Sequence, residues 1–149
     1  MTGGCGFIGS HLVRRLLELG FEVVIFDNFY RSSNVVVDGA SVVKGDLRFA
    51  PAVERALDGV EVVYHLAALT DVRESVKKPR LYHRVNVDGT LNLLEGCRRV
   101  GVKRVIYVLS CAVYGEPVKL PISEDHPTNP LSPYAASKLA AEAYCRSCL

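Results

Sequence analysis

Short apolar runs alternate with longer stretches of helical periodicity along the whole sequence. This alternation is typical of α/β proteins, in which helices connect the strands of a parallel sheet. The runs that predict strands are Phe21–Phe26, Ser41–Val43, Glu61–Leu66 and Arg104–Leu109. We therefore predict a doubly wound parallel sheet.

The segments between and after these runs predict helices. They are Ser10–Leu19, Phe49–Leu57, Arg80–Val100 and Tyr134–Cys148. Gly20 and Gly101 directly follow two of them and are typical helix stops. Five of the seven prolines fall between Pro117 and Pro133, which predicts an irregular surface loop of extended geometry.

Composition excludes several classes of protein. A length of 149 residues suits one domain, and the formal net charge of +2 argues against a nucleic-acid binder. The longest apolar run, Val105–Leu109, has five residues, so we expect no membrane span. The start, Met1–Gly4, has no basic or apolar stretch, so we expect no signal peptide. We therefore predict a single soluble domain in the cytoplasm.

The sequence contains five cysteines. We expect them to be free thiols, because the cytoplasm is a reducing compartment. Cys145 and Cys148 have the spacing of a redox or metal-binding pair. No second pair and no closely spaced histidines accompany them, and zinc needs about four ligands. We interpret the pair as incidental and predict no metal site.

A glycine-rich segment, Gly3–Gly9, leads directly into the first predicted helix. Glycines let the backbone approach a diphosphate, and a helix N-terminus offers unpaired N–H groups. A tight turn uses the same residues, so the segment alone is weak evidence. However, Asp27 ends the next strand, 18 residues after Gly9, where an acid can accept both ribose hydroxyls of an adenosine and repel a 2′-phosphate. Together these features predict NAD rather than NADP as cofactor.

Two further segments follow predicted strands, and strand C-termini line the ligand crevice of a doubly wound sheet. Asp46 and Leu47 follow the third strand, and His65–Ala68 ends the fourth. The small Ala67 and Ala68 would let a flat cofactor lie against the backbone. Each residue taken singly is as well explained by core packing.

Tyr134 and Lys138 lie four residues apart, which places a phenol and an ammonium on one helix face. A nearby cation lowers a tyrosine pKa from about 10, which makes the phenolate an available base. Ser110 follows the last predicted strand, where its hydroxyl could bind the reacting oxygen. The pair, the hydroxyl and the glycine turn are more specific together than singly.

These features occur in the order found in a known family. The motifs are Thr2–Ser10, Asp27–Asn28, Gly45–Leu47, His65–Ala68, Asn86–Thr90, Ser110–Gly115 and the pair Tyr134 and Lys138. The chain resembles, over essentially its whole length, the extended short-chain dehydrogenase/reductases of the NAD-dependent epimerase/dehydratase group, which act on nucleotide sugars. Glu74–Pro79 and Asn129–Tyr134 are most similar to its UDP-glucose 4-epimerase branch.

The resemblance implies a Rossmann fold and a set of site residues. Tyr134 would be the base, Lys138 its electrostatic partner and ribose ligand, and Ser110 the oxygen-binding hydroxyl. Asn86 would brace the site. The implied cofactor-binding residues are Gly3, Gly6, Phe7, Ile8, Gly9, Asp27, Asn28, Asp46, Leu47, Leu66, Ala67, Ala68, Asn86, Tyr134 and Lys138.

The tripeptide Ser110–Ala112 separates branches of the family. Dehydratases and decarboxylating relatives place a carboxylate at or next to the positions of Cys111 and Ala112, because elimination needs an extra acid and base. Neither residue supplies one here. We therefore expect a 4-epimerase of UDP-hexoses, in which NAD takes a hydride from C4 and returns it to the opposite face.

Parts of the family pattern are missing from the sequence. Only Met1 and Thr2 precede Gly3, so the first strand is almost absent, and the sequence stops after the Tyr134 helix, before the region that grips the nucleotide sugar. We expect residues 1–149 to be a partial NAD-binding domain. The open alternatives are an NAD-binding fragment without catalysis, another nucleotide-sugar epimerase or reductase, or a remnant that binds nothing.

The resemblance also implies a homodimer paired through the long helix and the Tyr134 helix. The apolar residues expected on this face are Leu81, Val85, Leu91, Leu94, Leu139, Ala140, Ala143 and Tyr144. A contiguous apolar patch usually marks an interface. The nearly absent first strand would also leave open strand edges, so a larger assembly is the alternative.

Overall fold

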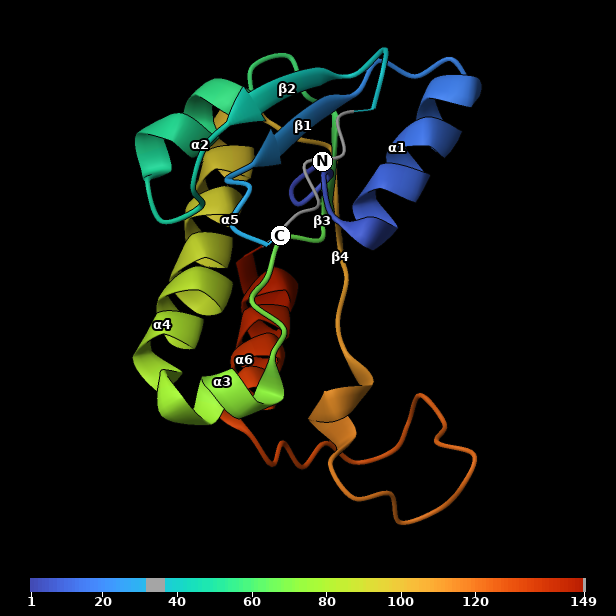
Figure 1. The fold of residues 1–149 in the computed structure, drawn as a ribbon, viewed down its shortest axis with the longest axis vertical. Coiled ribbons are helices and arrows are strands. Elements are labelled where there is room, and N and C mark those ends of the chain that lie inside the picture. The colour runs from blue at the N-terminus through green and yellow to red at the C-terminus, as the bar shows by residue number, and fades with distance from the viewer. Residues whose placement is uncertain (32–36, 149) are drawn as a thin grey trace.

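The structure is a computed structural model that describes residues 1–31 and 37–148. Helices and strands alternate along the chain (Figure 1). In order they are α1 (Phe7–Glu18), β1 (Val24–Asp27), β2 (Ser41–Lys44), α2 (Ala50–Ala56), β3 (Val62–His65), α3 (Val72–Lys77), α4 (Pro79–His83), a π-helical turn (Arg84–Asp88), α5 (Gly89–Val100), β4 (Arg104–Tyr107), a 3₁₀ turn (Cys111–Tyr114) and α6 (Pro133–Cys148).

The strands form two parallel pairs joined by the start of the chain. β1 pairs with β2, and β3 pairs with β4. Thr2 lies between the pairs and bridges to Phe26 of β1 and to His65 of β3. The sheet order is therefore β2, β1, Thr2, β3, β4, which is the doubly wound order predicted from the sequence.

The inner edges of β1 and β3 are not fully open, contrary to expectation. The backbone amide of Phe26 donates to the carbonyl of Met1 (2.8 Å), and the amide of Gly3 donates to the carbonyl of Phe26 (3.0 Å). On the other side, the backbone amide of Thr2 donates to the carbonyl of Tyr64 (3.0 Å). The backbone of residues 1–3 thus pairs with β1 on one side and with β3 on the other, as that of a strand would.

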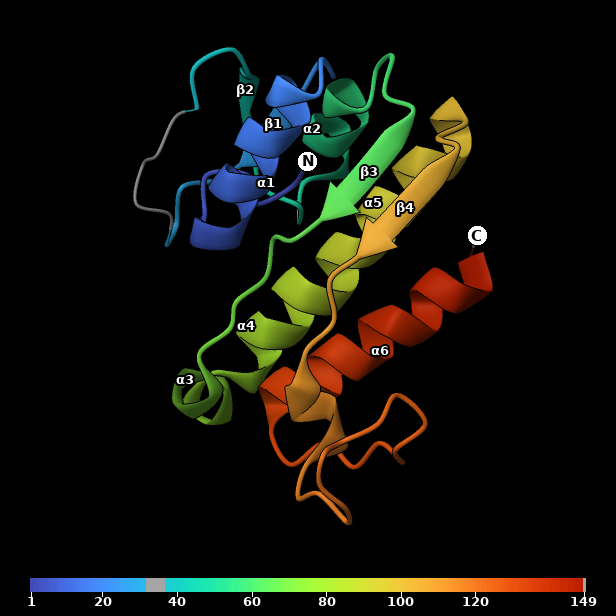
Figure 2. The same cartoon turned by 90° about the vertical axis from the view of Figure 1, so that its right-hand side faces the viewer.

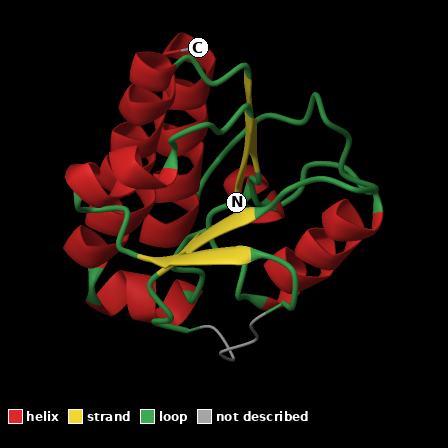
Figure 3. Cartoon of the chain, turned by 90° about the horizontal axis from the view of Figure 1, so that it is seen from above, coloured by secondary structure: helices red, strands yellow, loops and turns green. Residues whose placement is uncertain are grey.

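Helices cover both faces of the sheet. Seen from above, α1 lies on one side of the strands and the other helices gather on the opposite side (Figure 3). Val13 of α1 packs with Ile25 and Cys5 in one buried cluster. Val53 of α2 and Leu93 of α5 pack in another, against the opposite face. None of the helices within the described ranges is long and apolar enough to cross a membrane.

The observed boundaries differ from the predicted ones for physical reasons. Phe21–Val23 lie outside β1, because the β2 ladder begins where Ser41 pairs with Val24. The segment Arg80–Val100 is helical as predicted, but a π-helical turn interrupts it. The sequence does not predict α3, because its six residues hold one apolar pair, Val72 and Val76, and both are exposed. Pro117–Pro133 is irregular as predicted, up to the residue where α6 begins.

The expected apolar face on the long helix is wrong in part. Leu94 is 1% exposed and belongs to the core. Leu81 and Val85 pack inward against a buried cluster that contains Tyr82. The apolar stripe of this helix is therefore used within the chain, whereas Tyr144 of α6 stays exposed.

Candidate active site

A cavity of about 510 Å³ lies where the strands end, within the usual size range of small-molecule sites. β3 and β4 run side by side toward it, and α6 crosses beside them (Figure 2). Of the residues predicted from the sequence, all but Asn86 and Ser110 line this cavity. They are Gly3, Gly6, Phe7, Ile8, Gly9, Asp27, Asn28, Asp46, Leu47, Leu66, Ala67, Ala68, Tyr134 and Lys138.

The glycine turn has no space for a side chain at Gly3 or Gly9. A Cβ on Gly9 would lie 2.2 Å from the carbonyl oxygen of Gly3. A Cβ on Gly3, which has φ +68°, would lie 2.7 Å from the amide of Ala67. The turn feeds directly into α1, whose N-cap Gly6 has no side chain to bind the first amides. The backbone of this turn can therefore approach an anion such as a diphosphate closely.

Asp27 is fixed at the end of β1. It is 8% exposed, and its carboxylate accepts the backbone amides of Cys5 (3.1 Å) and Phe29 (2.8 Å). These bonds hold the carboxylate between the glycine turn and the cavity. An acid in this position can accept hydroxyl groups of a ribose.

Asp46 forms a second acidic position, at the end of β2. It accepts two bonds from the guanidinium of Arg48 (2.7 and 2.9 Å) and one from the amide of Asn28 (3.1 Å). The bonds from Arg48 hold the pKa of Asp46 well below its usual range, so it is a carboxylate at neutral pH. The positive charge of Arg48 is therefore paired with Asp46 within the wall of the cavity.

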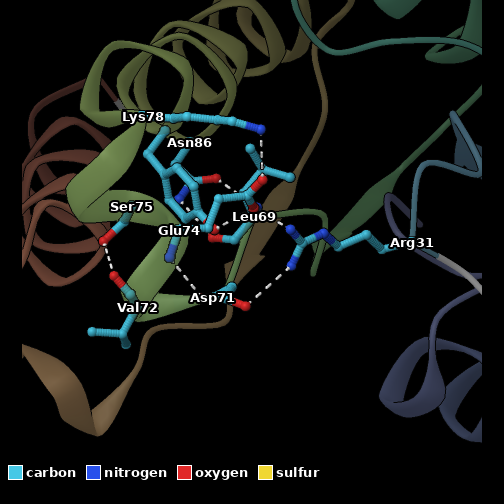
Figure 4. Close-up of polar contacts among 9 residues, drawn as sticks. Arg31, Leu69, Asp71, Val72, Glu74, Ser75, Lys78 and Asn86 are labelled. Atoms are coloured by element: carbon cyan, nitrogen blue, oxygen red, sulfur yellow. Dashed lines mark hydrogen bonds and ion pairs between the residues drawn. The ribbon is translucent and has the colours of Figure 1, made fainter.

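Asn86 lies behind the cavity wall and joins two of its segments. Its side chain accepts the amide of Leu69 (2.8 Å) and donates to the Leu69 carbonyl (3.0 Å), as Figure 4 shows. It also donates to the hydroxyl of Ser137 (2.9 Å), which donates to the carbonyl of Tyr134 (2.7 Å). Asn86 therefore ties the segment after β3 to α6 and does not itself line the cavity.

His65 lies in a buried hydrogen-bond chain that sequence reasoning missed. Thr90 donates its hydroxyl proton to the carbonyl of Asn86 (2.6 Å), so its oxygen accepts from Nε2 of His65 (2.9 Å). Nδ1 is then the acceptor for the hydroxyl of Thr2 (2.6 Å). Burial lowers the pKa of His65 to about 3, so the ring is neutral. A polar residue within an apolar run was the available signal.

Tyr134 and Lys138 lie on one wall of the cavity, in α6, and are 8% and 3% exposed. The ammonium of Lys138 donates to the carbonyl of Val108 (2.7 Å) and lies 4.1 Å from the centre of the Tyr107 ring. Burial lowers the pKa of Lys138 to about 8. The Tyr134 ring packs edge-on against Tyr82. A buried cation and a phenol thus face the same ligand space.

Ser110 is not among the residues that line the cavity, although Leu109 beside it is. It caps the 3₁₀ turn, and its oxygen accepts the amide of Ala112 (3.2 Å). Its neighbour Cys111 is exposed, and all five cysteines are free thiols. Within residues 1–31 and 37–148, no three His, Cys, Asp or Glu side chains gather as a metal site would require.

The cavity also includes charged residues that the sequence analysis did not assign to the site. Arg31 and Arg48 both line it, beside the predicted acids. The sequence indicated them only by spacing, since each lies within four residues of an acid that follows or ends a strand.

Comparisons with known proteins agree with this architecture. The sequence model of the NAD dependent epimerase/dehydratase family matches residues 1–148. A putative UDP-glucose 4-epimerase of Methanocaldococcus jannaschii is 43% identical over 149 residues, which cover 98% of this chain and 49% of that protein. The chain spans about half the length of the curated relatives it matches.

Solved structures are similar over the same extent. The UDP-glucose 4-epimerase of Thermus thermophilus in complex with NAD has a TM-score of 0.93 at 43% identity, over 98% of this chain and 49% of that one. The enzyme of Thermotoga maritima with UDP-glucose has a TM-score of 0.94 at 36% identity, over 99% and 49%. These likenesses confirm the predicted doubly wound fold.

Proposed function

The chain belongs to the NAD-dependent epimerase/dehydratase family, and we propose that its protein is a UDP-hexose 4-epimerase that uses NAD for transient oxidation at C4. The carrying observation is one cavity that holds the glycine turn and Asp27 together with Tyr134 and Lys138. Similar proteins named UDP-glucose 4-epimerases, solved with NAD and with UDP-glucose, support the proposal.

The residues fit an NAD molecule along the strand ends. The turn before α1 would hold the diphosphate, because a Cβ on Gly3 or Gly9 would collide with backbone. Asp27 would accept the ribose hydroxyls of the adenosine. When bound, NAD would accept a hydride from C4 of the sugar and give it back to the opposite face of that carbon. We propose residues 1–149 as the NAD-binding part of the protein.

Tyr134 is the proposed base for the 4-hydroxyl of the sugar. Deprotonation creates negative charge on the phenol oxygen, and the ammonium of Lys138, one turn along α6, stabilises that charge. Ser110 is the proposed donor to the reacting oxygen. Because Ser110 accepts from Ala112, its own proton remains available for donation.

An assay of the complete protein tests this function. UDP-galactose is supplied, and UDP-glucose is measured by chromatography of the stopped reaction; turnover without net conversion of NAD to NADH is expected. Net oxidation of NADH would instead identify a reductase of the same family. NAD binding without any turnover would favour a binding domain without catalysis, and absence of NAD binding would favour a structural remnant.

We also propose that the protein is a homodimer. The small residues Ala136, Ala140 and Ala143 lie on α6, and a groove between α4 and α6 includes Ala136, Ala140 and Arg80. Small side chains let helices of two subunits approach closely. Light scattering at micromolar concentration tests the proposal; a monomer of the full mass contradicts it. The cytoplasmic location stays a prediction.

A further inference from the structure

Arg31 lines the cavity and joins the segment after β1 to α3. Its side chain reaches toward α3, as Figure 4 shows. Nη2 forms an ion pair with Glu74, and Nη1 lies 4.0 Å from the carboxylate of Asp71. Glu74 is 43 residues further along the chain, in the helix that follows β3.

Glu74 is a fixed anchor for this contact. Its side chain is 16% exposed and accepts from the ammonium of Lys78 (3.1 Å) and from the hydroxyl of the buried Tyr82 (3.1 Å). These donors, with Lys78 first, hold the pKa of Glu74 below its ordinary value. The side chain of Arg31 is 42% exposed, so it is the partner in this ion pair that can move away.

The topology places this contact across the path of a dinucleotide. β1 and β3 flank Thr2, and Arg31 and Glu74 belong to the segments that follow these two strands. The ion pair therefore joins segments that follow the two strands on either side of Thr2, which leads into the glycine turn. A ligand that extends within the cavity from Asp27 to Tyr134 would pass beside Arg31, which lines the same cavity.

We propose that Arg31 and Glu74 form a tie across the cavity that slows release of the bound dinucleotide. The proposal rests on the NAD binding proposed above. Arg48 pairs with Asp46 on the wall beside β2 and does not cross the cavity. Lys78 also pairs with Glu74, but both belong to the α3 side. Of these three ion pairs, the Arg31 contact is the one that joins the two sides, and it opens when the ligand leaves.

The test is the dissociation rate of radiolabelled NAD from the complete protein, measured by chase with excess unlabelled NAD. Arg31→Gln and Glu74→Gln are expected to release NAD about two- to fivefold faster, the range that an exposed ion pair provides. The matched control Lys78→Gln removes the other exposed cation of Glu74 and is expected to leave the rate unchanged. Added salt should accelerate release from the wild type more than from Arg31→Gln.

The outcomes separate this proposal from the function. Equal release from wild type and Arg31→Gln, or an equal effect of Lys78→Gln, overturns the tie while NAD binding stands. A wild-type protein that binds no NAD overturns both. Glu74→Gln keeps an acceptor for Tyr82, so thermal melts of the free variants should match and loss of folding is separable from loss of the tie.

Discussion

The ammonium of Lys138 donates a hydrogen bond to the carbonyl of Val108 at 2.7 Å, which fixes the cation of α6 at the end of β4. This bond orients the ammonium but does not offset the free-energy cost of burying its charge. The pKa of Lys138 is therefore lowered to about 8. The charge assigned to the reaction is thus lost within the range where the enzyme can be assayed.

We expect kcat/KM to fall as the pH rises through about 8. The sign follows from the lowered pKa: below it Lys138 is charged and stabilises the phenolate, and above it the charge is gone. Lys138→Arg, at whatever lower activity, should not show this fall. Initial rates between pH 6.5 and 10 check both profiles, and a wild-type profile that stays flat contradicts the assignment.

Tyr134→Phe is expected to lower the rate of hydride transfer by about 10²–10⁴-fold, the usual contribution of a general base. NAD affinity should change little, because the ring still packs against Tyr82 and the glycine turn is untouched. NADH absorbance after addition of UDP-glucose measures the transfer, and calorimetry measures binding. Lys138→Ala should weaken both hydride transfer and NAD binding. Undiminished hydride transfer in Tyr134→Phe would exclude the mechanism.

NAD should bind at least about tenfold more tightly than NADP, because the fixed carboxylate of Asp27 repels a 2′-phosphate. Arg31 and Arg48, the cations that could offset this, are paired with Glu74 and Asp46. Asp27→Asn should reduce the ratio of the NAD affinity to the NADP affinity. Calorimetric titration of both cofactors decides the question, and tighter binding of NADP would contradict it.

Two glycine substitutions should separate stability from binding. Gly9→Ala would place a Cβ 2.2 Å from the Gly3 oxygen, and we expect a loss of about 1–3 kcal/mol in unfolding free energy. In Gly6→Ala the nearest atom is 3.3 Å away, so stability should change less while NAD affinity falls. Urea unfolding and calorimetry measure the two effects; equal destabilisation by both variants would contradict this account of the turn.

His65 should make the protein less stable in mild acid. Its pKa is about 3 in the fold against 6.5 ordinarily, so the unfolded chain takes up a proton first as the pH falls below 6.5. Between pH 6.5 and 4 this group should lower the unfolding free energy by up to about 1.4 kcal/mol per pH unit. His65→Gln can still accept from Thr2 and donate to Thr90, but lacks the titration. Urea unfolding at several pH values tests whether its slope is shallower than that of the wild type.

The order of strands and helices was predictable from the sequence because apolar periodicity reflects burial. The glycine turn and Asp27 were predictable because the two features occur together, with the acid ending the strand that follows the turn and its helix. Contacts such as Arg31 with Glu74 were not predictable, because surface charges carry no periodic signal and their partners depend on the fold. Leu94 was misplaced for a related reason, since periodicity shows which face is apolar but not what covers it.

The bridge made by Thr2 also bears on how binding and folding are linked. The backbone that pairs with both β1 and β3 continues directly into the turn proposed to hold the cofactor. A ligand that orders this turn therefore also orders the junction between the two halves of the sheet. A ligand that binds only the folded state adds about 2.7 kcal/mol of stability at 100 times its Kd. The dinucleotide would then act as a structural part of the domain.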